Sequence, residues 1–418
     1  MSTSYIFNPD NDLALGNNDA NYQAPLSAKR MAYDLSILPA WYATEGDTIL
    51  LPDSNALYYL ERDKETSILI PRVKWSTLRE ELPQQPISPW GWNPSLIKLL
   101  SQKGLNTKWL PTSATIQDIR QLSNRQFASK LLDEIRLELD NAHPLTGETI
   151  VCHTENEVST YIQAIPQSLL KAPWSGSGKG LRRAQGIYAP PLCGWCKRIL
   201  QQQDSLIVEP LYNKIVDFAM EFHTTNDSVS FVGYSYFTTD ANGAYKGNTI
   251  TSDKRIEEML GSYIPVETLV ALQKTIKSLL TRKLLGRYTG YVGVDMMIVD
   301  KQKNIDHKTE NKGTHYLLHP CVEINLRMNM GVVAHTIYER YVSHDSQGIF
   351  TVSYYPSNEK LRSTHEEKKK NHPTIISKDG RIIEGYLNLT PIGKETLYIA
   401  SIEVYRSNGQ SISFTTSF

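Results

Sequence analysis

The chain has 418 residues, a length that predicts two or three domains. Its residues are 40% hydrophobic and 21% charged, which is the composition of a soluble globular protein. Its 44 Lys and Arg balance 44 Asp and Glu, so bulk charge does not favour nucleic acid or an anionic membrane as a partner. No apolar run is long enough to cross a bilayer, and no export signal opens the sequence. Four cysteines fit a reducing compartment, so we expect a cytoplasmic protein.

Residues 1–114 alternate short apolar runs with helix-like segments, which predicts a small Rossmann-like α/β domain with a partly parallel sheet. Two distinctive loops occur here, "NPDNDLALGNN" at 8–18 and "SPWGWNP" at 88–94. Ligands usually sit at loops that follow the strands of such sheets, although ordinary turn chemistry explains each loop at least as well. The expected strands are "SYIF", "DTILLP", "TSILIP" and "TKWLP".

Two further units and a tail follow. A helix from Ser123 opens a unit over 115–211, in which strands alternate with two helices. Residues 212–345 contain long alternating strands, an amphipathic helix near 265–286 and a helix over 332–343. The tail, 346–418, is a strand-rich extension whose charged run "HEEKKKNHP" is expected to be a surface loop.

The stretch "CVEINLRMNMG" places Glu323, Asn325 and Arg327 on one face of a predicted strand. In "YVGVDMMIVD", Asp295 lies on the polar face of another. If the two strands are antiparallel neighbours, two carboxylates and an amide oxygen converge, and these are ligands that Mg²⁺ accepts. Arg327 could then reach an anion beside the metal. A surface ladder of salt bridges is the alternative.

A glycine-rich loop follows the strand that ends at Lys171, in "LLKAPWSGSGKGL". Small residues let backbone N–H groups approach phosphate oxygens, and lysine adds positive charge. The loop is not a P-loop, because that motif requires glycine where Pro173 stands and Ser or Thr where Gly180 stands. A flexible turn is the alternative.

A third signal is "SLIVEPLYNKIVDFAMEF", in which an apolar strand delivers Glu209 and, after a short break, Asp217. A carboxylate beside an extended segment can accept a hydrogen bond from an adenine amino group. A second acid nearby can hold ribose hydroxyls. Each acid alone would more often be structural.

In this order, these motifs resemble the ATP-grasp superfamily over about residues 115–340. The resemblance implies two α+β subdomains that clamp ATP between their sheets. It also implies that Lys171 contacts the ATP phosphates beneath a flexible loop, that Glu209 lies in the adenine hinge and that Asp217 holds the ribose. The loop residues are Ser175, Gly176, Ser177, Gly178, Lys179 and Gly180, and the hinge continues through Pro210, Leu211 and Tyr212.

The resemblance further implies that Asp295, Glu323 and Asn325 bind one or two Mg²⁺, with Mn²⁺ as an alternative ion. Arg327 would stabilise the transferring phosphoryl group or the acyl intermediate. Many relatives carry a lysine in the preceding helix, where this chain offers Arg125 or Lys130. Further phosphate or substrate contacts are expected from Lys246 and Arg287.

The function implied is an ATP-dependent carboxylate–amine, or carboxylate–thiol, ligase that works through an acylphosphate. Its expected partners are small molecules, and a homodimer is the default for a soluble enzyme of this size. Alternatives are an ATP-grasp kinase acting on a hydroxyl, a nucleotide-binding module without turnover, and a structural protein. Cys193 and Cys196 form a lone "CGWC", better explained as two semi-buried thiols than as a redox or zinc motif.

Overall fold

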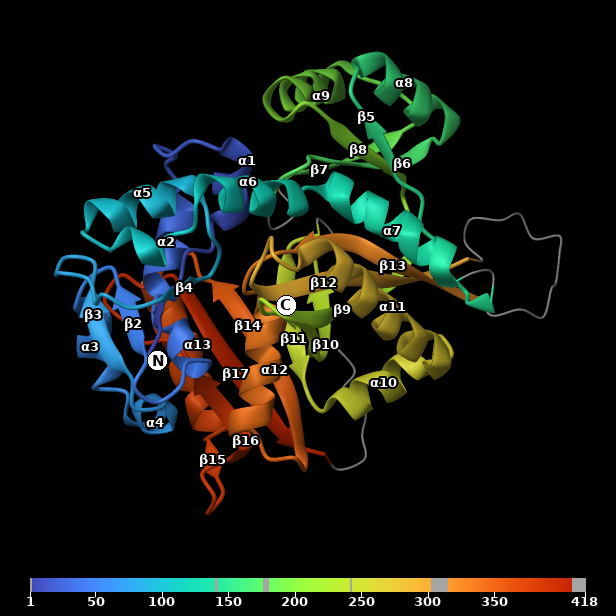
Figure 1. Ribbon diagram of the computed structural model, residues 1–418. Helices are drawn as coiled ribbons and strands as arrows, with labels where there is room; N and C mark the ends of the chain where they lie inside the picture. The colour runs from blue at the N-terminus through green and yellow to red at the C-terminus, as the bar shows by residue number, and fades with distance from the viewer. Residues whose placement is uncertain (1, 140–141, 176–179, 241–242, 302–314, 408–418) are drawn as a thin grey trace.

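The computed structural model describes residues 2–139, 142–175, 180–240, 243–301 and 315–407. Within these residues the chain forms two four-stranded sheets and one nine-stranded sheet. Figure 1 shows the two smaller sheets at the left and the top, and the large sheet in the body of the molecule. No helix of the described residues is long and apolar enough to cross a membrane.

The N-terminal sheet is parallel, with strand order β3-β2-β1-β4, as the alternating pattern predicted. Its strands are β1 (Ser4–Ile6), β2 (Thr48–Leu51), β3 (Lys74–Thr77) and β4 (Ile87–Pro89). Around it lie α1 (Asn11–Asn17), α2 (Leu26–Asp34), η1 (Leu38–Trp41), α3 (Asn55–Leu60), α4 (Lys64–Leu69) and α5 (Pro94–Gln102).

Two of the expected strands in this region are wrong. The run "TSILIP" lies largely in α4, where the Asp63 side chain accepts a hydrogen bond from the Thr66 N–H and caps the helix. The run "TKWLP" begins with a 3-10 turn, η2 (Thr107–Trp109), capped by Asn106. A short apolar run does not distinguish strand from helix, and in both cases a local cap decided the outcome.

The upper sheet is antiparallel, with order β5-β8-β6-β7. Its strands are β5 (Ile150–Cys152), β6 (Gln167–Lys171), β7 (Leu181–Gln185) and β8 (Leu206–Pro210), and α8 (Glu155–Ala164) and α9 (Pro190–Gln203) cover it. Residues of both helices and of the strands share a separate core. The upper sheet and its two helices therefore form a compact layer above the rest of the molecule.

The large sheet has the order β13-β12-β9-β10-β11-β14-β17-β16-β15 and is antiparallel throughout. Its strands are β9 (Lys214–Thr224), β10 (Val229–Thr239), β11 (Tyr245–Ile250), β12 (Gly290–Asp300), β13 (Tyr316–Asn325), β14 (Ser346–Tyr354), β15 (Ile375–Ile376), β16 (Ile382–Asn388) and β17 (Tyr398–Arg406). The helices beside it are α6 (Ser113–Leu122), α7 (Arg125–Leu139), α10 (Asp253–Gly261), α11 (Val266–Leu284), α12 (Met330–Tyr341) and α13 (Asn358–Asn371).

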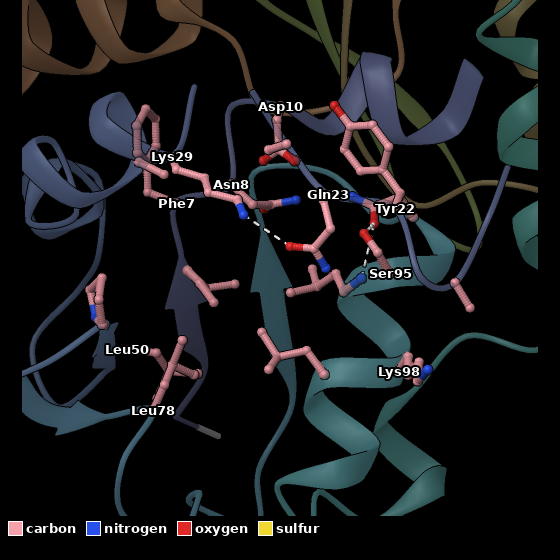
Figure 2. A pocket seen from close by; sticks show the side chains of 18 of the residues that line it. Phe7, Asn8, Asp10, Tyr22, Gln23, Lys29, Leu50, Leu78, Ser95 and Lys98 are labelled. Carbon is pink, nitrogen blue, oxygen red and sulfur yellow. Dashed lines mark hydrogen bonds between the residues drawn. The ribbon is translucent and has the colours of Figure 1, made fainter. Parts of the chain in front are cut away.

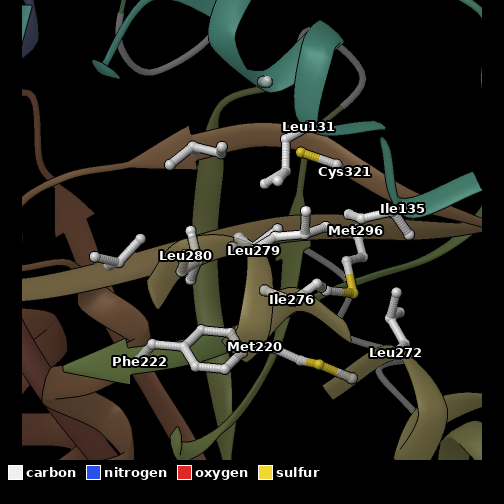
Figure 3. Close-up of a cluster of buried hydrophobic side chains, with 14 of the residues drawn as sticks. Leu131, Ile135, Met220, Phe222, Leu272, Ile276, Leu279, Leu280, Met296 and Cys321 are labelled. Carbon is white, nitrogen blue, oxygen red and sulfur yellow. The ribbon is translucent and has the colours of Figure 1, made fainter. Parts of the chain in front are cut away.

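Alternation along β9 assigns the two faces of this sheet. Phe218, Met220 and Phe222 are fully buried and pack against α7 and α11 in the largest apolar core (Figure 3). The residues that alternate with them, including Asp217 and Glu221, point to the opposite face, because successive side chains of a strand alternate. That opposite face carries the polar residues of the candidate site.

The tail does not form a separate sheet, because β14, β17 and β16 extend the large sheet beyond β11. The charged run at 365–373 was expected to be a loop, and this is wrong, because most of it lies in α13. Ser357 caps that helix by accepting from the Lys360 N–H, and Leu361 is buried beneath it. The charges form the solvated face of a helix.

Candidate active site

Strands β12 and β13 are antiparallel neighbours, as predicted, and their register places Asp295 opposite Glu323. Gly293 lies opposite Asn325, so the polar residues of both strands share one face. The Asn325 side-chain N–H donates to an Asp295 carboxylate oxygen at 3.1 Å. The two carboxylates and the amide therefore converge. The alternative, a surface ladder of salt bridges, would not require this convergence.

This convergence of acids affects their ionisation. Burial, and then the charges of Glu323 and Glu221, raise the pKa of Asp295 well above its usual range. A cation bound beside such a carboxyl group would lower its pKa and stabilise the ionised form. The donor set, two carboxylates and one amide, suits Mg²⁺, which needs only one or two protein carboxylates. No cluster of three or more Asp, Glu, His or Cys suited to a metal occurs among the described residues.

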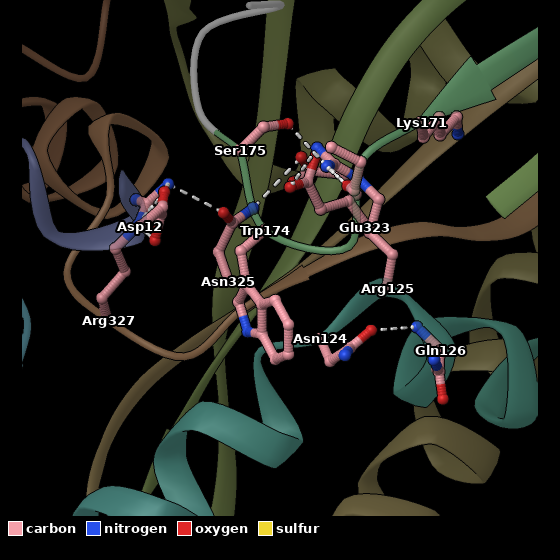
Figure 4. Close-up of polar contacts among 12 residues, drawn as sticks. Asp12, Asn124, Arg125, Gln126, Lys171, Trp174, Ser175, Glu323, Asn325 and Arg327 are labelled. Atoms are coloured by element: carbon pink, nitrogen blue, oxygen red, sulfur yellow. Dashed lines mark hydrogen bonds and ion pairs between the residues drawn. The ribbon is translucent and has the colours of Figure 1, made fainter. Parts of the chain in front are cut away.

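Arg125, at the start of α7, links this acidic pair to the glycine loop (Figure 4). Its guanidinium donates to the Ala172 carbonyl at 2.6 Å, to Ser175 Oγ at 2.7 Å and to Glu323 Oε1 at 2.7 Å. Of the two cations offered by the sequence, Arg125 is buried in this cluster, whereas Lys130 is exposed on α7.

Lys171 ends β6 and forms a buried ion pair with Glu209 of β8, with a distance of 2.6 Å between Nζ and Oε2. Their side chains are 4% and 3% exposed. Burial raises the pKa of Glu209, and the Lys171 charge opposes that shift. The two residues that the sequence assigned to phosphate and adenine thus lie side by side on neighbouring strands.

The residues after Glu209 leave the sheet in an extended segment. Pro210 ends β8, and the Leu211 N–H donates to the Gln167 carbonyl at 2.8 Å. The Tyr212 hydroxyl accepts from the Glu148 N–H at 2.9 Å. Of the predicted loop over the phosphates, Ser175 and Gly180 frame the ends, and a Cβ on Gly180 would lie 2.2 Å from Ser175 Oγ. Gly176, Ser177, Gly178 and Lys179 lie outside the described residues.

Asp217 lies on the same face of the large sheet as Asp295, opposite Met297 in the register of β9 and β12. Lys214 and Thr239 hold its carboxylate. Lys246 is exposed on β11. Arg287 forms an ion pair with Asp118 of α6, and that contact does not join it to the acidic cluster.

Arg327 follows β13 and connects the cluster to the N-terminal domain (Figure 4). Its Nε and Nη2 atoms donate to the two carboxylate oxygens of Asp12, at 2.9 and 2.7 Å. Nη2 also donates to the side-chain amide oxygen Oδ1 of Asn325 at 2.9 Å. Residues 8–18 were expected to be a loop, and this is wrong for Asn11–Asn17, which form α1. Sequence reasoning did not assign Asp12, in the first turn of that helix, because its partner is 315 residues away.

Both distinctive N-terminal loops reach this point. The Asn8 side chain donates to the Gly91 carbonyl at 2.8 Å, which joins the "NPDND" and "PWGW" segments. The Met328 N–H, directly after Arg327, donates to the Trp90 carbonyl at 2.8 Å. The two loops therefore meet at the end of β13, beside the polar face.

Glu221 is a second residue that sequence reasoning missed. It lies opposite Gly293 on β9, is 2% exposed, and accepts from the Asn329 side-chain N–H at 2.7 Å. Burial raises its pKa to about 7. The signal was present in "DFAMEF", where Asp217 and Glu221 share the face opposite three large apolar residues.

The cysteines of "CGWC" lie in α9, away from this cluster, and both are free thiols. Cys196 is buried, and burial raises its pKa to about 11. A raised pKa disfavours the thiolate that redox chemistry and zinc binding require.

Comparisons with known proteins agree with this architecture. A scan against protein-family models and a search of curated proteins gave no match. Among solved structures, biotin carboxylase from Campylobacter jejuni in a β-γ-ATP complex matches with a TM-score of 0.51 and 12% identity, over 97% of this chain and 87% of that one. L-amino acid ligase from Bacillus licheniformis matches with a TM-score of 0.48 and 11% identity, over 98% and 95%. N5-carboxyaminoimidazole synthetase from Staphylococcus aureus, complexed with ADP, matches with 0.47 and 12%, over 97% and 93%.

The match to biotin carboxylase, together with the strand order of the two antiparallel sheets, defines the fold. The chain has the ATP-grasp fold, preceded by a parallel α/β domain, as the sequence resemblance implied.

Proposed function

We propose that the protein is an ATP-dependent carboxylate–amine ligase. One observation carries this proposal, namely the set of contacts that joins four residues of two adjacent strands. Asp295 faces Glu323, the Asn325 side chain donates to Asp295, and Arg327, which follows the second strand, donates to Asn325. Such a face combines metal ligands with a cation for an anionic transition state. A protein that only bound a nucleotide would not require the complete set.

In this proposal Lys171 and the loop that starts at Ser175 contact the ATP phosphates. The extended segment from Glu209 to Tyr212 binds adenine, and Asp217 holds the ribose. Asp295, Glu323 and Asn325 hold Mg²⁺. When bound, Mg²⁺ neutralises charge on the transferring phosphoryl group. Arg125 would keep Glu323 oriented, since the two are already paired.

The reaction proceeds in two steps. A substrate carboxylate oxygen bonds to the γ-phosphorus of ATP while the bond to the β-phosphate oxygen breaks, giving an acylphosphate and ADP. The amine nitrogen then bonds to the carbonyl carbon, and phosphate leaves with the electron pair of the broken C–O bond. If the substrate nitrogen binds as an ammonium group, it first loses one proton to solvent, and the proton that it loses on forming the amide goes to phosphate. Arg327 and Lys171 stabilise charge that develops on the phosphoryl oxygens.

The Glu323→Gln variant tests the metal face. It keeps the shape of the side chain and removes its charge, so we expect metal-dependent ATP turnover to fall about a hundredfold or more, roughly 3 kcal/mol of transition-state stabilisation. ADP release is measured over a range of Mg²⁺ concentrations. Glu258→Gln is the matched control, because Glu258 is exposed on α10 and pairs only with Arg255 among described contacts. Unchanged turnover in Glu323→Gln would contradict the assignment.

A screen of amino acids, dipeptides and polyamines for acceptor-dependent ADP release tests the reaction type. A ligase releases ADP and phosphate in amounts that match amide product and stop when the amine is omitted. ADP release without an amine, with a stable phosphorylated product, would instead identify the kinase alternative. Both outcomes are read from the same assay by phosphate analysis and mass spectrometry.

A further inference from the structure

A cavity of about 450 Å³ lies in the N-terminal domain, outside the polar face described above. It opens where the parallel strands β1 and β2 end, between α2 and α5, and Figure 2 shows it from close by. The carboxyl ends of parallel strands are the usual ligand position in open α/β sheets. The volume suits a small metabolite and lies within the range of ligand pockets.

The chemistry of the cavity differs between its two ends. Asp10, Asn8, Gln23 and Lys29 lie together at one end, where Lys29 Nζ donates to Gln23 Oε1 at 2.9 Å (Figure 2). Apolar side chains line the other part. They are Ile6, Leu50, Pro52, Leu78, Leu96 and Leu99.

The polar end holds charges of both signs, and Asp10 is the one acid among the residues that line the cavity. Burial and the charge of Asp12 raise the pKa of Asp10, and the charge of Lys29 opposes that rise. Asp10 is half-buried, whereas Lys29 and Gln23 are exposed, so Asp10 is the charge that gains most from a bound cation. A ligand with an ammonium group beside an anion complements Asp10 and Lys29 together.

The polar end is also adjacent to the proposed phosphoryl-transfer site. Asp10 is two residues from Asp12, so their Cα atoms are at most about 7 Å apart. Asp12 is itself held by Arg327 through a two-point ion pair. Asp10, at the N-cap of α1, therefore lies within the same helical turn as the residue that holds Arg327, beside which the proposed reaction requires an acceptor amine.

We propose that this cavity binds the amine substrate, and that this substrate is an α-amino acid with an apolar side chain. Asp10 accepts hydrogen bonds from the ammonium group, Lys29 exchanges Gln23 for the α-carboxylate, and the side chain enters the leucine-lined part. The inference rests on the proposed ligase function. It gives the "NPDND" loop two roles, since Asp10 binds the acceptor and Asp12 holds Arg327.

The test measures equilibrium binding by calorimetry to the full chain saturated with Mg²⁺ and a non-hydrolysable ATP analogue. The probes are L-leucine, L-methionine and L-phenylalanine, compared with 4-methylpentanoic acid, which is leucine without the ammonium, and 3-methylbutylamine, which is leucine without the carboxylate. We expect at least one amino acid to bind at least tenfold more tightly than both truncated probes. Asp10→Asn and Lys29→Met should each weaken that binding at least tenfold while the dissociation constant of the ATP analogue stays unchanged.

The controls are Glu80→Gln and Lys103→Met, which make matched charge changes at exposed positions of the same domain that do not line the cavity. Both should bind the amino acid as the unmodified protein does. If the ATP analogue binds but no amino acid binds at concentrations on the order of 10 mM, the inference fails and the proposed function stands. Equal affinity for 4-methylpentanoic acid, or normal binding by Asp10→Asn, overturns it too. Failure of the ATP analogue to bind would instead overturn the proposed function.

Discussion

At the scale of single residues, the candidate site sorts its acids by the partner each one has. Three of the acids form ion pairs: Glu209 with Lys171, Asp12 with Arg327, and Glu323 with Arg125. A buried charge persists only when it is paired and hydrogen-bonded. Asp295 and Glu221 instead receive hydrogen bonds from the amides of Asn325 and Asn329. Burial raises the pKa of both acids, and an amide opposes that rise less than a paired cation does.

Glu221 should make the stability of the protein depend on pH. Its pKa is about 7 in the folded protein and near its usual value of 4.5 when unfolded. Between these values the folded state holds a proton that the unfolded state has lost, so stability falls as pH rises, by roughly 3 kcal/mol in all. Urea denaturation of the metal-free protein at pH 5 and pH 8 should show this fall added to that from other raised acids such as Asp295, and Glu221→Gln should show a correspondingly smaller fall.

Glu267→Gln, at an exposed position of α11, is the control and should keep the pH dependence of the unmodified protein. Parallel pH profiles for Glu221→Gln and the unmodified protein would show that Glu221 ionises normally in the fold.

At the scale of elements, α12 lies against the polar face of the large sheet and closes the space around Glu221. Gly331 lies in the first turn of this helix, and a Cβ there would lie 2.4 Å from Glu221 Oε1 and 2.5 Å from Ser235 Oγ. The glycine thus permits the close approach of helix and sheet. Close packing, and not the backbone conformation, requires glycine at this position, because φ at Gly331 is outside the left-handed region.

Gly331→Ala should therefore destabilise the protein by about 1–3 kcal/mol, because the added methyl group overpacks a closed space. The measurement is the free energy of unfolding from denaturant titration. Gly194→Ala in α9 is the matched control: a Cβ there meets nothing within 4 Å, so the variant should be unchanged or up to about 1 kcal/mol more stable. Equal effects of the two substitutions would contradict the packing argument.

At the scale of the whole molecule, the N-terminal domain and the tail share one core. Residues from β2, η1, α12, β14 and β17 pack in a single apolar cluster. Trp41 is fully buried in it, donates its indole N–H to the Leu389 carbonyl at 2.7 Å, and packs edge-on against Tyr341. This shared core fixes the domain that carries Asp10 and Asp12 against the sheet that carries Arg327.

Trp41→Ala should accordingly destabilise the protein by about 3–5 kcal/mol through cavity formation and the unpaired Leu389 carbonyl. Because the core is shared, circular dichroism and tryptophan fluorescence should still report one coincident unfolding transition. Trp109→Ala is the comparison, since Trp109 is only partly buried in the smaller core of the N-terminal domain, and its effect should be smaller. Two separate transitions would show that the domains are independent.

The sequence determined the elements in which alternation continues over many residues and in which the two faces differ in polarity. The alternation in "YVGVDMMIVD" and "CVEINLR" predicted two strands, and pairing them predicted that Asp295, Glu323 and Asn325 converge, which the register confirms. Only the tertiary structure identified Asp12 as the partner of Arg327, Arg125 as the partner of Glu323, and the cavity beside Asp10. A period along one strand is a local property of the chain, whereas an ion pair across 315 residues depends on how whole domains pack.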